Sequence, residues 1–218
     1  MTPPPHHALR DRYLAAQLAG DQRAALKVLD EALAAGSEVA DLQRDVVQAA
    51  QLELGRLWQE NRLSIAHEHM ATAISQVALV HLLRHAETAT PRQRKVVVAC
   101  VEGEHHDLPA RMVADFLELE GYEVRYLGAN VPSEALPDLL TAERPHVVCL
   151  SVTMVFNLGG LRGAVEAVRA RLPGLPILAG GNAVAWQPDI ADELGVTAVL
   201  GDTDALVAAI ERAVEARP

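Results

Sequence analysis

The stretch VACVEGEHHDLPARMVADFLELEGYEVRYLG, residues 98–128, changes its residue pattern three times. It starts with an apolar run typical of a buried strand, which ends in a loop crowded with acidic residues and histidines. An amphipathic segment with helical spacing follows at once, and then a second short apolar run. A strand, a helix and a strand in this order form a right-handed βαβ unit. The stretch therefore predicts a parallel sheet whose first strand ends in a chemically unusual loop.

The same alternation continues along the rest of the sequence. Short runs rich in Val, Ile and Leu, namely KVVVACV, EVRYLG, HVVCLSV, PILAGG and TAVLG, alternate with amphipathic segments. This pattern predicts a parallel sheet of five strands with helices on both faces, and we assign residues 94–217 to it. Such sheets bind ligands beyond the carboxyl ends of their strands. The histidine-rich loop, SVTM and AGGNAV all fall at these ends.

Residues 8–90 have a helical period instead. Four amphipathic segments follow one another with short connections: ALRDRYLAAQLAG, DQRAALKVLDEALAAG, SEVADLQRDVVQAAQLELGRLWQENR and SIAHEHMATAISQVALVHLLRHAE. Asp21 can cap the second helix, and Gly20 and Gly36 can end the first and the second. These features predict an antiparallel four-helix bundle. A linker at residues 88–94 joins it to the sheet domain.

Composition and charge exclude several classes of function. The chain has 218 residues and a formal net charge of −10, with no basic patch of the kind that binds nucleic-acid phosphates. Its apolar runs are shorter than the ~20 residues that cross a membrane, and its first residues lack a secretion signal. Cys100 and Cys149 lie in strand-like runs, which indicates buried reduced thiols. We therefore expect a cytoplasmic protein that contacts neither membrane nor nucleic acid.

The loop after the first strand brings a carboxylate close to a histidine. Glu104 precedes His106 by two positions, so both side chains can leave the loop on the same side. A carboxylate bonded to one ring nitrogen fixes the tautomer and raises the basicity of the other nitrogen, as in metal-binding histidines. Ser151, at the end of a later strand, can hydrogen-bond the carboxylate. No further cluster in this half completes a zinc site. A single protein ligand fits a metal that arrives inside a macrocycle.

The segment EGEHHDLPARMVADFLELEGYEVRYLGANVP, followed by SVT and GGN, resembles the cobalamin-binding flavodoxin-like (Rossmann-type) domain of corrinoid methyl carriers, mutases and cobalamin photoreceptors. The family pattern Asp-x-His-x-x-Gly reads Glu104-x-His106-x-x-Pro109 here. The resemblance implies that His106 is the metal ligand below cobalt and displaces the cofactor's own dimethylbenzimidazole tail, the base-off form. The cofactor-binding residues that it implies in this domain are Glu104, His106, Asp107, Leu108, Ser151, Thr153, Gly180 and Gly181. Glu in place of Asp lengthens the supporting arm, and Pro109 removes a backbone donor.

The helical half carries a second pattern, in which nine residues separate Trp58 from Glu68 and His69. By itself this pattern is typical of a bundle-core aromatic and two solvated polar residues. It also resembles the cap of the CarH-type photoreceptors, which bind adenosylcobalamin and enclose its adenosyl group with Trp and Glu. This resemblance spans nearly the whole chain. It implies that Trp58, Ile65, Glu68 and His69 contact the upper face of the cofactor.

Two departures from the CarH-type proteins refine this interpretation. Their helix-turn-helix domain is absent from the sequence, so we expect no direct DNA binding. The histidine that follows their Trp and can ligate cobalt after illumination is Gln59 here, so water, hydroxide, His67 or His69 would replace it. A CarH-like module without the DNA-binding domain also resembles the photocobilins, which bind a bilin such as biliverdin as well. Candidate histidines for the bilin propionates are His81, His85 and His146.

The function expected from this resemblance is light sensing, without catalysis by the chain itself. Light would cleave the cobalt–carbon bond, and the cap would shift. The oligomeric state or the interface for a downstream signalling protein would then change. A corrinoid methyl carrier for separate methyltransferases is the alternative, since it uses the same lower ligand. A third hypothesis is an interaction module that has lost cobalamin. A mutase is not expected, because the sequence contains no substrate barrel.

Overall fold

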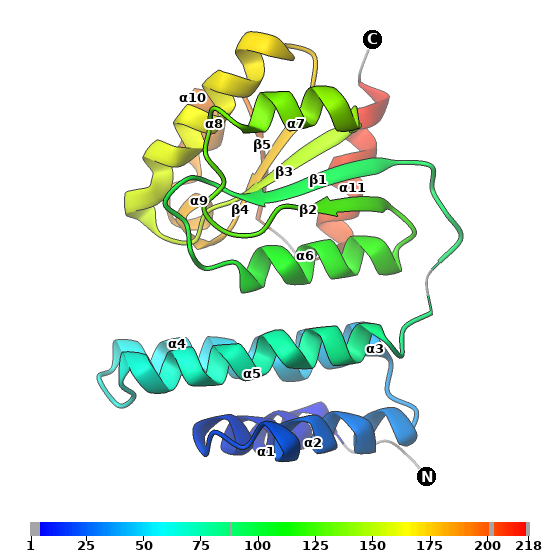
Figure 1. The fold of residues 1–218 in the computed structure, drawn as a ribbon, viewed down its shortest axis with the longest axis vertical. Coiled ribbons are helices and arrows are strands. Elements are labelled where there is room, and N and C mark those ends of the chain that lie inside the picture. Colours follow the sequence, from blue (N-terminus) through cyan, green and yellow to red (C-terminus); the bar gives the residue numbers. More distant parts are fainter. Residues whose placement is uncertain (1–4, 88, 201–202, 217–218) are drawn as a thin grey trace. The chain divides into compact units, whose positions relative to one another are not determined.

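The computed structural model describes residues 5–87, 89–200 and 203–216 (Figure 1). Contacts between residues divide the chain into two compact units, residues 1–87 and 88–218. We call them the helical unit and the sheet unit and describe each by itself. The predicted fold class, a helical bundle followed by a five-stranded parallel sheet, is confirmed.

In its described residues, the helical unit consists of helices and short connections. Its elements are α1 (His6–Leu18), α2 (Gln22–Ala34), α3 (Val39–Leu42), η1 (Gln43–Gln48), α4 (Ala49–Gln59) and α5 (Ile65–Leu83). α3, η1 and α4 are continuous and correspond to the third predicted helix. η1 is a π-helical insertion within it, a widened turn that the sequence pattern did not indicate.

Helix ends in this unit follow the capping signals of the sequence. The Asp21 side chain accepts a hydrogen bond of 2.9 Å from the backbone N–H of Ala24 at the start of α2. Gly20 and Gly36 follow α1 and α2 with φ of +69° and +91°, a backbone conformation that favours glycine. Ser64 caps α5 through its hydroxyl oxygen. These short-range signals explain why the predicted helix boundaries agree with the structure.

The sheet unit alternates strands with helices. Its described elements are β1 (Lys95–Cys100), α6 (Leu108–Leu119), β2 (Glu123–Tyr126), α7 (Leu136–Glu143), β3 (Val147–Ser151), η2 (Val155–Asn157), α8 (Leu158–Arg171), β4 (Ile177–Gly180), α9 (Asn182–Trp186), α10 (Asp189–Leu194), β5 (Thr197–Val199) and α11 (Thr203–Glu215). Neighbouring strands pair in parallel in the order β2-β1-β3-β4-β5. The chain moves outward in opposite directions from β1 and β3, so the topological switch point lies between these strands.

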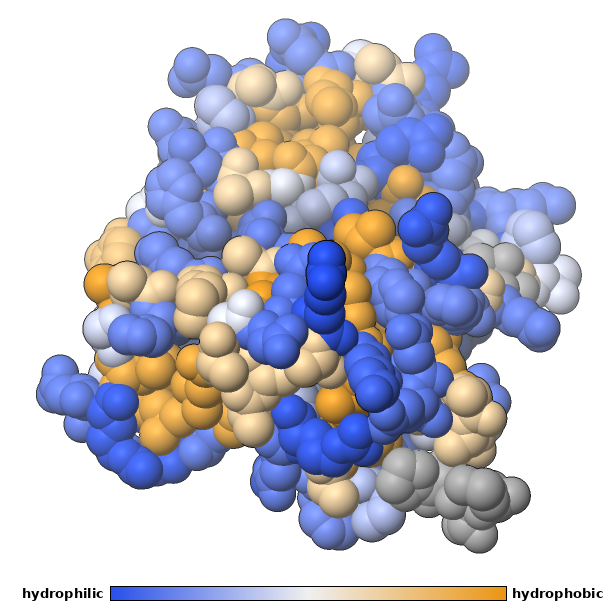
Figure 2. Space-filling model, turned by 60° about the horizontal axis from the view of Figure 1, so that its bottom comes forward, coloured by the Kyte–Doolittle hydropathy of each residue, from blue (hydrophilic) through white to orange (hydrophobic). Residues whose placement is uncertain are grey.

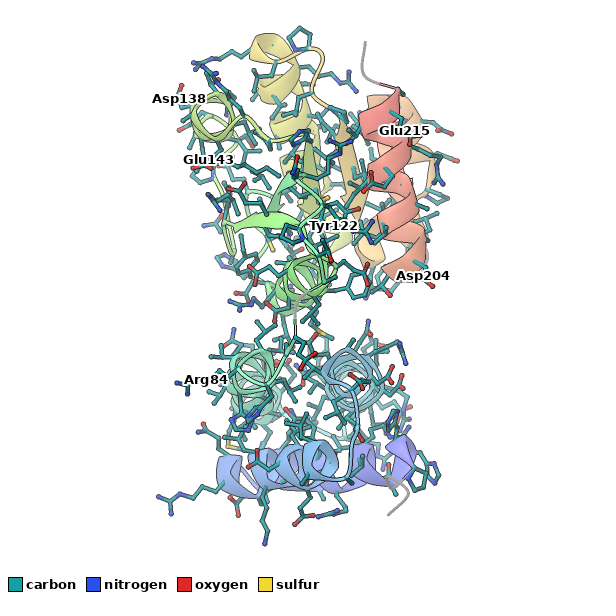
Figure 3. All side chains as sticks on the ribbon, turned by 90° about the vertical axis from the view of Figure 1, so that its right-hand side faces the viewer. Arg84, Tyr122, Asp138, Glu143, Asp204 and Glu215 are labelled. Carbon is teal, nitrogen blue, oxygen red and sulfur yellow. The ribbon has the colours of Figure 1, made fainter. Side chains whose placement is uncertain are left out.

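Helices cover both faces of this sheet, and side chains from both faces are buried. On one face, alternate residues of β1, β3 and β4 pack against α7, α8, α9 and α10. On the other face, the intervening residues pack against α6 and α11. Figure 3 shows the two layers: Asp138 and Glu143 mark α7 on one side of the sheet, and Asp204 and Glu215 mark α11 on the other.

The remaining sequence expectations concern the cysteines and the surface. Cys100 and Cys149 are free and buried, as expected. Among the described helices, none has both the length and the apolar character that crossing a membrane requires. On the face shown in Figure 2, apolar areas lie between hydrophilic ones. Large apolar side chains are exposed in both units, among them Trp58, Ile65, Phe156 and Trp186.

Candidate cofactor site

The loop between β1 and α6 lies at the carboxyl end of the sheet, beside the switch point. After β1, the N–H of Val101 donates to the carbonyl of Ser151 at the end of β3 (3.2 Å). Gly103 then turns the chain with φ +84°. Its N–H donates to Oδ1 of Asn130, whose own N–H donates to the carbonyl of Glu104, at 2.8 Å in both cases. Asn130, from the loop after β2, thus holds this turn at two points.

Glu104 is completely buried at the centre of the site. Its Oε1 accepts the backbone N–H of His106 (2.9 Å) and lies 2.6 Å from Nδ1 of the same residue. Its Oε2 accepts the N–H groups of Thr153 (2.8 Å) and Met154 (2.9 Å) and Nδ2 of Asn157 (3.0 Å). Burial raises the pKa of this carboxyl group, but the hydrogen bonds, led by the one from the His106 side chain, lower that pKa well below its ordinary value. Glu104 is therefore a carboxylate at neutral pH.

His106 is exposed although its partner is buried: 55% of its side chain is accessible, against 0% for Glu104. The contact predicted between these two side chains is confirmed. With Nδ1 bonded to the carboxylate, Nε2 is the ring atom suited to bind a metal, and the carboxylate raises its basicity. The donor set therefore fits a cobalt ion held from the protein side by one imidazole.

The predicted bond between Ser151 and the Glu104 carboxylate is wrong. Among the described residues, the carboxylate instead takes partners from the loop after β3, at Thr153 and Asn157. Ser151 is the last residue of β3 and is the register partner of Cys100 on β1. Its side chain hydrogen-bonds that thiol, whose pKa burial raises to about 12. The carboxylate lies beyond the end of the strands, where residues of the following loop reach it better.

Thr153 has an unsatisfied hydroxyl group. Its Oγ1 is buried and has no hydrogen-bond partner in the part of the chain that the structure describes. A buried polar atom without a partner costs about 1–3 kcal/mol, so such atoms in native proteins call for a specific explanation. The backbone N–H of Thr153 bonds to Glu104, which fixes this residue beside the paired carboxylate and imidazole. A ligand with a polar group would satisfy the hydroxyl.

The two glycines after β4 differ in what the fold requires of them. A Cβ on Gly181, which has φ +104°, would lie 2.3 Å from the carbonyl oxygen of Val152, so glycine is required there. A Cβ on Gly180 would meet its nearest neighbour, the carbonyl oxygen of Val199, at an ordinary 3.5 Å. The fold therefore tolerates a larger residue at position 180. Glycine there places no side chain at the carboxyl end of β4, and we call this bare stretch of backbone the cradle.

Asp107 and Leu108 connect the loop to α6. The backbone carbonyl and the carboxylate of Asp107 accept from the hydroxyl of Tyr126 on β2, at 3.2 and 3.3 Å. The Leu108 side chain is buried, so a cofactor would contact the backbone of this residue. Pro109 lies in the first turn of α6, where its missing N–H leaves no helical bond unmade.

The predicted upper-face residues lie at the end of α4 and the start of α5. Trp58 and Ile65 are 40% and 52% exposed, so the interpretation of Trp58 as a bundle-core aromatic is wrong. Glu68 is held from two sides. The hydroxyl of Thr72 donates to its Oε1 (2.7 Å), and Nδ1 of His69 lies 2.6 Å from its Oε2. Two exposed apolar groups and an oriented carboxylate thus belong to one end of the helical unit.

A polar row of hydrogen bonds continues from Thr72 into the core of this unit. Gln51 on α4 donates to the Thr72 hydroxyl (2.9 Å) and accepts from Nε2 of Gln17 on α1 (3.4 Å). The same nitrogen of Gln17 donates to Oγ of Ser75 (2.8 Å), which lies 3.1 Å from the hydroxyl of Tyr13. Gln17, Ser75 and Tyr13 are completely buried. The polar row positions Thr72 and, through it, Glu68.

Both units match families of known proteins. Residues 94–211 match a family described as B12 binding domain, and residues 9–83 match a second family of the same description. The two matches together include the residues of the sheet edge and those around Trp58. They agree with the predicted binding of a corrinoid.

Individual relatives come from two groups of proteins. The HTH-type transcriptional repressor CarH of Myxococcus xanthus is 32% identical over 196 residues, which are 89% of this chain and 64% of that protein. Trimethylamine corrinoid protein 1 of Methanosarcina acetivorans is 27% identical over 143 residues, which are 63% of this chain and 65% of that protein. The chain thus spans less than two thirds of the length of either relative.

Among solved structures, the monomethylamine corrinoid protein of Methanosarcina barkeri has the same fold. It superposes with a TM-score of 0.82 over 95% of this chain and 100% of that chain. The identity is 19%, so the similarity shows the architecture alone.

Proposed function

The chain belongs to the B12-binding domain family, and from this premise we propose that it is a light sensor that binds adenosylcobalamin. The observation that carries this proposal is that the oriented carboxylate of Glu68 and the exposed Trp58 belong to the same end of the helical unit. A site for a fixed upper ligand needs such groups in addition to a lower ligand. The similarity to CarH over most of the chain supports the same assignment.

On the lower side, we assign the cobalt ligand to Nε2 of His106 and the tail of the cofactor to the cradle at Gly180. Glu104 keeps the imidazole in the tautomer that has an unprotonated Nε2. The unsatisfied hydroxyl of Thr153 would find its partner in the tail. When bound, adenosylcobalamin supplies a cobalt–carbon bond that visible light breaks. The residues of the chain bind and orient it.

On the upper side, we assign contacts with the adenosyl group to Trp58, Ile65, Glu68 and His69. The two apolar side chains supply packing, and the Glu68 carboxylate accepts hydrogen bonds from hydroxyl or amino groups. Loss of the adenosyl group would leave a gap that closely packed side chains tolerate poorly. Trp58 and Ile65 would then seek another apolar surface. Light would thereby alter self-association or the binding of a downstream signalling protein.

The test is to load the full chain with adenosylcobalamin in the dark and then to illuminate it. We expect a histidine-ligated cobalamin spectrum in the dark, a different spectrum after illumination, and a change in size measured by light scattering. His106→Ala should abolish the histidine-ligated spectrum, whereas His105→Ala, in the exposed neighbour, should preserve it. A spectrum and a size that do not respond to light contradict the proposed sensing.

A corrinoid methyl carrier is the second candidate function. The similarity to trimethylamine corrinoid protein 1 favours it. A carrier has to present its methyl group to a separate methyltransferase, whereas bulky Trp58 suits a fixed adenosyl group. Titration with both cofactors separates the two functions. A sensor binds adenosylcobalamin more tightly and loses that preference in Trp58→Ala; a carrier prefers methylcobalamin, and Trp58→Ala leaves the preference unchanged.

A bilin as a second chromophore stays a prediction. Of the three histidines considered for it, His81 pairs with Asp30 (2.6 Å) and His146 accepts the N–H of Lys95 (3.0 Å). These contacts compete with binding of propionates. Absorption in the red after addition of biliverdin would support a bilin site.

Two further assignments concern the illuminated state and the location. The carboxamide of Gln59 is a poor replacement for an imidazole on cobalt, so water, hydroxide, His67 or His69 would occupy the upper position after illumination. The free, buried cysteines support a location in the reducing cytoplasm. Spectra of illuminated His67→Ala and His69→Ala test the first assignment, because a ligand from either histidine would disappear in its own variant.

A further inference from the structure

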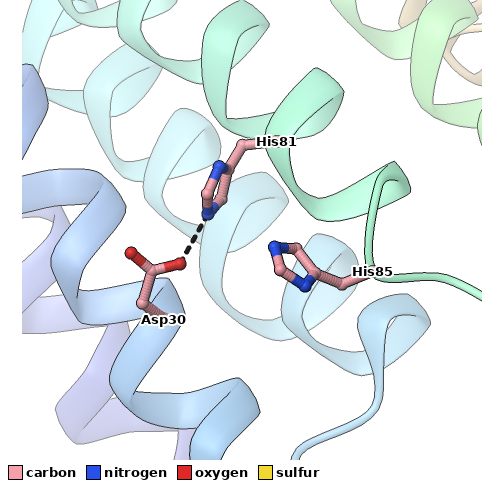
Figure 4. A group of neighbouring side chains, drawn as sticks. All are labelled: Asp30, His81 and His85. Carbon is pink, nitrogen blue, oxygen red and sulfur yellow. Dashed lines mark hydrogen bonds and ion pairs between the residues drawn. The ribbon is translucent and has the colours of Figure 1, made fainter.

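Asp30, His81 and His85 form a cluster in the helical unit that has no part in the proposed cobalamin site (Figure 4). His81 is in the last turn of α5, and His85 lies in the turn that follows the helix, where its N–H donates to the carbonyl of Leu82 (2.9 Å). Their ring centres are 5.2 Å apart. Asp30 is on α2, and its Oδ1 lies 2.6 Å from Nε2 of His81. One ligand atom from each residue lies within 4.8 Å of the other two.

We propose that these three residues bind a zinc ion that links α2 to α5. Zinc binds imidazole nitrogen and carboxylate oxygen at about 2.0–2.2 Å, which places the ligands of a tetrahedral site roughly 3.3 Å apart. The separations in the structure lie on both sides of this spacing, from 2.6 Å between Asp30 and His81 to an upper limit of 4.8 Å for the whole set. Two imidazoles and one carboxylate leave the fourth position of the tetrahedron for water.

Burial and charge at the cluster suit a divalent cation. The His81 side chain is 24% exposed and the Asp30 side chain 53%, so an ion can enter from solvent. A bond between these two residues alone would be an ordinary helix–helix contact. The imidazole of His85 beside them turns the contact into a three-ligand set. The carboxylate offsets part of the charge of the ion, and both histidines bind it in their neutral form.

The zinc site is separate from the proposed upper-face residues. His81 lies almost four turns beyond Glu68 on the same helix, about 20 Å at about 1.5 Å per residue. Zinc binding therefore does not depend on the proposed function, and either proposal can fail alone. A bound ion would fix α2 against the helix that carries Glu68. It would also stabilise the helical unit, because it binds the folded state.

The experiment is a zinc titration of the full chain without cobalamin, in which calorimetry and competition with a chromogenic chelator measure binding. We expect one ion per chain and a higher Tm with zinc. Asp30→Asn, His81→Gln and His85→Gln should each weaken binding by about tenfold or more, since even the partners of metal ligands contribute about 10–100-fold. His7→Gln, in an exposed histidine of α1 outside the cluster, is the control and should bind zinc like the native chain.

Circular dichroism of each variant separates loss of binding from loss of fold. A folded native chain that binds no zinc overturns the proposal. Zinc binding that survives removal of all three side chains also overturns it. Binding that is lost in His106→Gln but retained in His85→Gln would place the ion at the sheet edge and would equally contradict a site between α2 and α5.

Discussion

Nδ1 of His106 lies 2.6 Å from Oε1 of Glu104, and this bond joins a mostly exposed ring to a completely buried carboxylate. The second carboxylate oxygen bonds to the loop after β3. The position of the ring therefore depends on two neighbouring strands rather than on the flexibility of one loop. Such a support is suited to a metal ligand that has to stay in place while the group above it changes.

Glu104→Gln should weaken cobalamin binding by about 10–100-fold, the usual contribution of a residue that supports a metal-binding histidine. The amide has one acceptor oxygen where the carboxylate has two, so its NH₂ group would face N–H donors. Titration with adenosylcobalamin, followed by absorbance, measures the loss. Glu102→Gln, in the exposed neighbour on the same loop, should bind like the native chain. Equal weakening in both variants would argue against a specific role of Glu104.

Glu104 should also make the stability of the sheet unit sensitive to acid. Its pKa is lowered by folding from an ordinary 4.5, so the folded state binds fewer protons than the unfolded state. The stabilisation is then fully present above about pH 4.5 and is lost as pH falls toward the folded pKa. Urea unfolding from neutral to acid pH should show a smaller pH dependence in Glu104→Gln. If the free energy of unfolding changed equally with pH in both proteins, Glu104 would not be the source of the acid sensitivity.

Gly180→Ala and Gly181→Ala should separate cofactor binding from folding. The first adds a methyl group to the cradle without a clash, so the free energy of unfolding should change by less than about 1 kcal/mol. Cobalamin binding should nevertheless weaken by about tenfold or more, the cost of about 1.4 kcal/mol of lost contact. The second forces a Cβ against Val152 at positive φ and should cost about 1–3 kcal/mol of stability. Denaturation and titration of both variants measure the difference, and normal cofactor binding by folded Gly180→Ala would exclude the cradle.

Thr72→Val should loosen Glu68 while it keeps the shape of the side chain. The variant leaves Nε2 of Gln51 without its acceptor, which costs about 1–3 kcal/mol if the amide finds no other partner. Affinity for adenosylcobalamin should fall, whereas affinity for hydroxocobalamin, which has no adenosyl group, should stay the same. Thr72→Ser retains the hydroxyl and should behave like the native chain. A parallel fall for both cofactors would show a structural effect only.

The fold was predictable because its signals are local. Most strands of the sheet are short apolar runs, and the helices of the bundle have their own period, with capping residues Asp21 and Ser64 at the start of α2 and α5. The π-helical insertion at residues 43–48 has no comparable signal, since the apolar positions around it still follow a helical spacing. The helix at residues 203–215, which completes one face of the sheet, was not among the amphipathic segments identified from the sequence.

The site was predictable only where its members are close in the sequence. Glu104 and His106 are two residues apart, so their contact followed from spacing. Asn130 and Asn157 come from the loops after β2 and β3, and their contacts depend on strand order and register. The polar row is another example, because it joins three helices. A polar residue shortly after a predicted strand is a signal that could have identified Asn130, two residues beyond the run EVRYLG. Asn157 ends η2 and has no such signal.

The hydrogen bonds from Glu68 to Tyr13 connect a carboxylate at one end of the polar row to a phenol with ultraviolet absorbance at the other end. Burial raises the pKa of Tyr13 to about 12, with the bond to Ser75 acting in the opposite direction. The phenol therefore remains neutral at ordinary pH, and its ultraviolet band depends on the hydroxyl that it touches. The hydrogen bonds of the polar row connect Glu68 through Thr72, Gln51 and Gln17 to α1. Tyr13 is one of only three tyrosines in the chain. Its ultraviolet difference absorbance can therefore report a movement of the Glu68 carboxylate.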